Sequence, residues 1–138
     1  TDAINKGARI LTGGKRVTGK GYYFEPTVLT NVNHSMRVMV EESFGPIIGI
    51  QVVPNDAKAL EWMNDTTYGL TAGVYTPSKT RAQAILSKVN AGSAYWNCCD
   101  RVSPNLPWSG RQDSGLGSTL SHLGIRAFAR PKAYHWIG

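Results

Sequence analysis

The chain has 138 residues, of which 41% are hydrophobic and 17% are charged, a balance that excludes an intrinsically disordered protein. No apolar run approaches the ~20 residues of a membrane-spanning helix, and the first residues do not show the charged-then-apolar pattern of a secretory signal, so we expect a cytoplasmic protein without a membrane partner. The net charge is +6, but Lys and Arg are scattered, so we expect a solvated basic surface and no nucleic-acid partner.

The chain opens within a predicted helix. Residues 2–7 are typical of the last turns of a helix, with Gly7 as the stop signal. A natural domain seldom begins inside an element, so we interpret Thr1 as the product of a truncation. A short strand is predicted over residues 8–11, and residues 15–21 are polar and glycine-rich, as in a surface loop.

Two extended segments follow. Residues 22–29 are aromatic and β-branched, and Pro26 limits them to an edge strand or an irregular extended segment. Residues 38–42 lead into a Gly-Pro turn, after which the apolar run 47–53 is the clearest candidate for a buried strand.

Two helices are predicted next. Asn55 or Asp56 caps the first helix, and Ser78 caps the second, which Gly92 ends. Apolar residues recur at helical spacing on one face: Leu60 and Met63 in the first helix, and Ala82, Ile85, Leu86 and Val89 in the second.

The helices alternate with strands predicted over residues 69–76 and 93–98. This order is typical of parallel βαβ units with right-handed crossovers, which predicts an α/β fold with a mostly parallel sheet and flanking helices. Ligand sites in such sheets form at the carboxyl ends of the strands, so the irregular loop over residues 100–110 is the candidate site.

The end of the chain has weaker signals. A tight turn over residues 114–117 leads into a short helix predicted over 118–123, which Gly124 stops. Residues 128–137 alternate loosely, and we expect them to form an extended arm.

The two cysteines, Cys98 and Cys99, are neighbours in the sequence. A disulfide between them would be strained, and no second cluster of ligands supports a metal site. We expect free, small hydrophobic side chains in a reducing compartment.

Two carboxylates, a spacer, an aromatic residue and a Gly-Pro turn make up residues 41–46, directly before the apolar run. This stretch resembles the E-E-x-F-G-P signature of the aldehyde dehydrogenase superfamily. Four further stretches resemble family patterns in the expected order and spacing: residues 68–73, 96–97, 107–110 and 114–117. Three positions depart from these patterns: Trp96 stands for a common valine, Trp108 for phenylalanine and Ser109 for glycine.

The resemblance implies that residues 1–126 are the C-terminal portion of the catalytic domain and that 127–138 form an oligomerisation arm. Glu42 would accept hydrogen bonds from the nicotinamide ribose, the alternative being a surface acid in a turn. Phe44 would wall the nicotinamide ring, unless it is a core phenylalanine. Glu41 is more simply structural.

The resemblance also assigns residues to an aldehyde pocket. Trp108 matches an aromatic position that lines the aldehyde tunnel, although it could also be a lid over the core. Val102 falls near a second tunnel position and is small. Arg101 could bind the carboxylate of an acidic aldehyde, the alternative being a solvated or salt-bridged arginine.

The implied reaction is the oxidation of an aldehyde to a carboxylic acid with NAD or NADP. The family nucleophile lies in a G-Q-x-C context, which Cys98 and Cys99 lack, so we expect no catalytic residue in this chain and no activity from it alone. In relatives the last strand adds to a neighbouring subunit, which implies a homo-oligomer. The alternative is a non-catalytic interaction module that pairs through its C-terminal strand.

Overall fold

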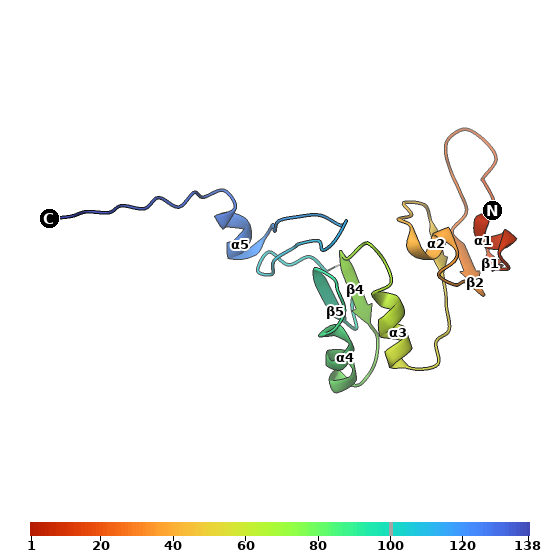
Figure 1. Cartoon of the computed structure of the whole chain (residues 1–138). Coiled ribbons are helices and arrows are strands. Elements are labelled where there is room, and N and C mark those ends of the chain that lie inside the picture. The colour runs from red at the N-terminus through yellow and green to blue at the C-terminus, as the bar shows by residue number, and fades with distance from the viewer. Residues whose placement is uncertain (100) are drawn as a thin grey trace. The chain divides into compact units, whose positions relative to one another are not determined.

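The computed structural model describes residues 1–99 and 101–138, which fold into two units, Thr1–Thr66 and Thr67–Gly138 (Figure 1). Asp100, the first residue of the predicted loop over 100–110, lies outside the described residues. Both units combine helices with strands, which confirms the mixed α/β content.

The first unit contains one sheet in the order β1-β2-β3, in which β1 and β2 are antiparallel and β2 and β3 are parallel. Its elements are α1 (Asp2–Asn5), β1 (Arg9–Thr12), β2 (Thr27–Thr30), α2 (Arg37–Val40), β3 (Ile47–Gly49) and α3 (Asp56–Met63). Five buried side chains form its core: Ala3, Ala8, Leu29, Val32 and Met36.

Two strand predictions in this unit are wrong in detail. The extended segment predicted over residues 22–29 becomes a strand only at Thr27, after Pro26, which has no N–H to donate to a ladder. The resulting β2 is the central strand of the sheet and not an edge. The strand predicted over 47–53 ends at Gly49, which is the last residue that pairs with β2. Val52 lies beyond this pairing and is 89% exposed.

The predicted helix starts are confirmed for both capped helices. The Asn55 side chain accepts a hydrogen bond from the Lys58 N–H at 2.9 Å at the start of α3. The Ser78 hydroxyl accepts one from the Arg81 N–H at 3.2 Å at the start of α4 (Lys79–Leu86). Each cap satisfies a backbone N–H that has no partner inside its helix.

The second unit is built on a parallel pair, β4 (Thr71–Val74) and β5 (Ser93–Trp96), connected by α4. This pair is the βαβ unit that the element order predicts, and α4 buries Ala82 and Ile85. However, β3 and β4 belong to separate sheets of the described residues, so the prediction of one mostly parallel sheet is wrong at that step.

The last helix differs from its prediction. α5 spans Ser121–Arg126, later than the expected 118–123, and it contains Gly124 instead of stopping there. A Cβ at Gly124 would lie 2.7 Å from the backbone carbon of Thr119, so the glycine allows a close approach between two segments. The prediction treated Gly124 as a stop signal, and the close contact with Thr119, just before α5, overrides that signal.

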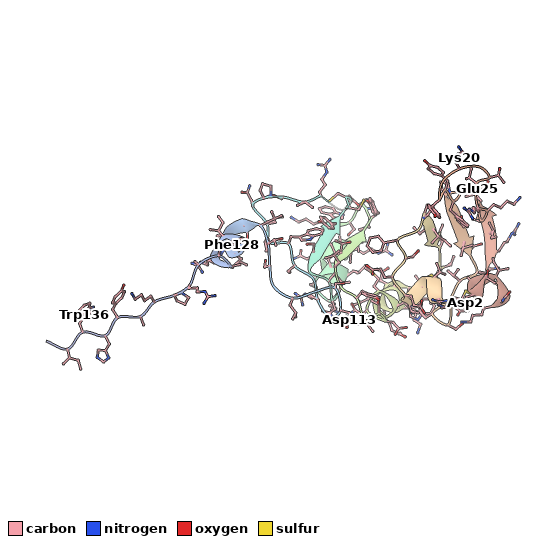
Figure 2. All side chains as sticks on the ribbon, turned by 90° about the horizontal axis from the view of Figure 1, so that it is seen from above. Asp2, Lys20, Glu25, Asp113, Phe128 and Trp136 are labelled. Atoms are coloured by element: carbon pink, nitrogen blue, oxygen red, sulfur yellow. The ribbon has the colours of Figure 1, made fainter. Side chains whose placement is uncertain are left out.

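After α5 the chain runs without helix or strand to its C-terminus (Figure 2). Phe128 and Trp136 lie along this tail and are 94% and 83% exposed. The extended conformation agrees with the predicted arm, while pairing of the arm with another subunit stays a prediction. None of the helices in residues 1–99 and 101–138 has the length and apolar character that a membrane span requires.

Candidate functional site

Glu41, Glu42 and Phe44, the acidic and aromatic residues of the signature stretch, lie between α2 and β3. α2 ends at Val40, and Glu41 continues with an extended backbone. The Arg37 Nε lies 2.9 and 2.8 Å from the two carboxylate oxygens of Glu41, one helical turn away. Glu41 is therefore engaged in a local ion pair with Arg37, which suits a structural role. Of the two adjacent acids, Glu42 is the one that does not bind Arg37.

Glu42 and Phe44 are both exposed. Glu42 lines an open hollow of the first unit together with Arg37, Val38, Glu41, Ser43 and Ile47. Phe44 is 96% exposed, so it is not a core phenylalanine of this unit. The Gly45 carbonyl accepts from the Ile47 N–H at 2.8 Å, a turn that directs the chain into β3. The segment thus presents a carboxylate and an aromatic ring to its surroundings.

In the second unit, Arg101, Val102 and Trp108 surround one cavity of about 200 Å³. The cavity lies against β5 and is bordered by residues of the loop that follows this strand, from Arg101 to Trp108. Its lining is mostly apolar, and Arg101 is the one charged residue among the described residues that line it: Gly92, Ser93, Ala94, Tyr95, Arg101, Val102, Ser103, Leu106, Pro107, Trp108 and Leu120. All three residues predicted for an aldehyde pocket are therefore brought together.

The loop is anchored to β4 and β5 at its start. Asn97 has a left-handed backbone with φ 52°, which turns the chain out of β5. Its side chain accepts a hydrogen bond from the Thr76 N–H at 2.9 Å and donates one to the Thr76 carbonyl at 3.0 Å. The Trp96 indole N–H also donates to this carbonyl, at 2.8 Å. The side chains of Trp96, at the end of β5, and Asn97, just after it, thus bind Thr76, two residues beyond β4.

The far side of the loop is fixed by backbone contacts. Trp108 and Thr119 exchange two N–H···O bonds of 2.9 Å, which hold the Trp108 ring segment beside the start of α5. A Cβ at Gly92 would lie 1.6 Å from the Ser109 carbonyl oxygen, so glycine is needed where the loop crosses the start of β5. The wall that carries Trp108 therefore depends on a close backbone contact.

Three contributors to this site were not predicted. Tyr95 lines the cavity, and its hydroxyl donates to the Arg101 carbonyl at 3.4 Å. Its place near the carboxyl end of a strand is the signal that could have revealed it. Asn97 was part of a matched motif, but its anchoring role requires the position of Thr76. Leu120 has no local signal, since it reaches the cavity through the Trp108–Thr119 pairing.

Glu42 and Phe44 belong to the first unit, and the cavity residues belong to the second. Cys98 and Cys99 are free. Within the described ranges, no three His, Cys, Asp or Glu side chains gather in a way that could hold a metal ion.

The family model described as "Aldehyde dehydrogenase family" matches residues 1–134. The mitochondrial aldehyde dehydrogenase of Leishmania tarentolae is 33% identical over 135 residues, which are 98% of this chain and 27% of that protein. The betaine aldehyde dehydrogenase of Hordeum vulgare is 37% identical over 132 residues, 94% of this chain and 26% of that protein. The NAD(P)+ succinate semialdehyde dehydrogenase Sad of Escherichia coli is 36% identical over 125 residues, which are 91% of this chain and 27% of that protein.

Solved structures give the same picture. A betaine aldehyde dehydrogenase from Staphylococcus aureus in complex with NAD+ matches with a TM-score of 0.87 at 31% identity, covering 99% of this chain and 30% of that one. Lactaldehyde dehydrogenase from Escherichia coli matches with a TM-score of 0.88 at 33% identity, and the match covers 92% of this chain and 27% of that one. The chain spans about a quarter of the length of the relatives it matches.

Proposed function

The chain belongs to the aldehyde dehydrogenase family, and on that premise we propose that it is the C-terminal part of an NAD(P)-dependent enzyme that oxidises an aldehyde to a carboxylic acid. The observation that carries the proposal is the convergence of Arg101, Val102 and Trp108 on one cavity. These residues were assigned to an aldehyde pocket from the resemblance alone, and they come from separate positions in an irregular loop.

The proposed role of Glu42 is to bind the nicotinamide ribose of the cofactor. Because Arg37 occupies Glu41, the exposed carboxylate available for two ribose hydroxyls is that of Glu42. Phe44 fits a role beside the nicotinamide ring. Burial of a phenylalanine side chain contributes roughly 1.5–3 kcal/mol, which the exposed Phe44 lacks, and contact with a bound ring would recover part of this free energy. The cofactor, when bound, accepts a hydride from the substrate.

The cavity favours an aldehyde with an apolar portion. Trp108 and Leu106 offer rigid apolar surface, and Val102 leaves room on its side. Arg101 adds a cation that would recognise a carboxylate on the substrate. Named relatives act on betaine aldehyde and on succinate semialdehyde, so the family alone does not select the substrate.

Arg101→Met in the longer protein tests the acidic-aldehyde hypothesis. If Arg101 binds a substrate carboxylate, we expect kcat/KM to fall about 10-fold or more for an acidic aldehyde and to change little for a neutral one. Equal effects on both substrates would leave Arg101 as a solvated arginine.

The nucleophile and the general base are proposed to lie outside this chain. Cys98 and Cys99 follow β5, downstream of the cofactor motif, and lack the G-Q-x-C context. The tail after α5 is proposed to add to the sheet of a neighbouring subunit, consistent with its exposed aromatic side chains. A relative is named as mitochondrial, so cytoplasmic location stays a prediction.

The test is Glu42→Gln in a protein that carries this chain together with its upstream coding region. Loss of charge-assisted hydrogen bonds worth about 1.5–3 kcal/mol should raise KM for the cofactor by roughly 10- to 150-fold, with little change in KM for the aldehyde. Glu25→Gln, which changes another acid of the same unit, is the matched control. An unchanged cofactor KM would refute the ribose role of Glu42.

A further inference from the structure

Cys98 and Cys99 form a vicinal pair of free thiols in a short connection that is anchored on both sides. Cys98 is half-buried and Cys99 is exposed. On one side, the Asn97 side chain is bound to the backbone of Thr76 at 2.9 and 3.0 Å. On the other side, the Arg101 carbonyl accepts from the Tyr95 hydroxyl at 3.4 Å. The backbone that carries the two thiols is therefore held against the end of β5.

The pair is poorly suited to oxidation to a disulfide. Neighbouring Cα atoms lie ~3.8 Å apart across a trans peptide, below the ~4.4–6.8 Å that disulfides span. The pair also lacks the further ligands that zinc requires, because the described residues hold no third His, Cys, Asp or Glu that could complete a metal site. Two soft sulfur ligands therefore remain available to an electrophile that needs only two.

The ladder of β5 does not hold the two thiols on opposite faces. β5 ends at Trp96, and the left-handed backbone of Asn97 turns the chain out of the strand before Cys98. A disulfide between adjacent cysteines closes a small ring through the two side chains and the peptide bond between them. An atom inserted between the two sulfurs enlarges this ring, so the two Cα atoms no longer need the separation that a disulfide requires. This favours a bridging atom over a direct S–S bond.

We propose that Cys98 and Cys99 form a dithiol site for monosubstituted trivalent arsenicals. In the reaction, the two thiols form two As–S bonds, the As=O bond breaks, and the two thiol protons leave with the oxygen as water. No electrons are transferred, so the step requires no oxidant. The arsenic keeps its single organic substituent and takes both sulfurs as ligands, a match to soft thiolate chemistry. The adduct would form on Cys98 and Cys99, and Cys99 lies two residues before Arg101, which lines the cavity.

The probe is phenylarsine oxide, added to the 138-residue chain and followed by intact-mass spectrometry. We expect one phenylarsenic group per chain, retained in excess glutathione and released by the dithiol 2,3-dimercaptopropanol. In Cys98→Ser and Cys99→Ser the arsenic has one sulfur ligand, so retention against glutathione should fall by about 100-fold, because the second bond is intramolecular in the unmodified chain.

Two controls keep the test decisive. Ser93→Ala removes a hydroxyl of the cavity lining, which does not include the two thiols, and should leave retention unchanged. Circular dichroism of both cysteine variants, together with Cys99→Ala at the exposed position, separates loss of a ligand from loss of folding. Absence of an adduct in the unmodified chain, or an adduct that survives glutathione in a folded single-cysteine variant, would overturn the proposal.

Discussion

Gly92 supports the cavity wall by leaving space for a backbone crossing. Its φ is not in the left-handed region, so the requirement is steric and not conformational. In Gly92→Ala the new Cβ would lie 1.6 Å from the Ser109 carbonyl oxygen and 2.6 Å from its carbon. The two segments would have to separate by roughly 1.8 Å to reach an ordinary contact.

Backbone hydrogen bonds resist that separation. Gly92 donates to the Gly69 carbonyl at 2.9 Å, and Arg111 donates to the same carbonyl at 3.0 Å. Overpacking costs about 1–3 kcal/mol, and loss of one of these bonds adds about 1 kcal/mol. We therefore expect the second unit to lose about 2–4 kcal/mol, which lowers its melting temperature by roughly 10–20 °C.

Thermal unfolding followed by circular dichroism measures this loss. Gly73→Ala is the matched control, because a Cβ there would meet its nearest atom, the Cys98 carbonyl oxygen, at an ordinary 3.5 Å. The control should change stability little or raise it slightly. Equal melting temperatures for the two variants would refute the steric role of Gly92.

Two further predictions concern the ends of helices. Ser121 begins α5 with a left-handed backbone, φ 54°, so Ser121→Gly should be more stable than Ser121→Ala by about 1–2 kcal/mol. Both variants lack the serine hydroxyl, so the difference between their urea midpoints measures the backbone effect alone. Equal midpoints would contradict the prediction. The pKa of Asp2 is lowered, first by the hydrogen bond from the Arg37 N–H and then by Lys6. Because the folded pKa is depressed, the stabilisation is full above the unfolded pKa of about 3.9 and is lost as pH falls through the folded pKa. The urea midpoint of Asp2→Asn should therefore lie below that of the unmodified chain at pH 6 and approach it in acid, whereas a difference that does not depend on pH would contradict this assignment.

Local chemistry explains which features could be predicted from the sequence. The starts of α3 and α4 were predictable because Asn55 and Ser78 satisfy N–H groups only three residues away. Trp108 was singled out by its motif and lines the cavity, while its role beside an aldehyde stays a prediction.

The remaining features depend on how the surrounding chain folds. Gly124 resembled a stop signal, but the close approach of Thr119 explains its presence inside α5. Val52 resembled a buried strand residue, although β3 ends before it. Leu120 enters the cavity only because Trp108 and Thr119 pair across 11 residues. No local pattern contains that information.

The central claim is that this chain contributes cofactor and substrate contacts but not the reacting groups. Its most direct test is the rate of NAD(P)H formation by the pure 138-residue chain with a panel of aldehydes, beside the longer protein that includes the upstream region. We expect no NAD(P)H formation above the buffer rate for the 138-residue chain and measurable turnover for the longer protein. Turnover by the chain alone would contradict it.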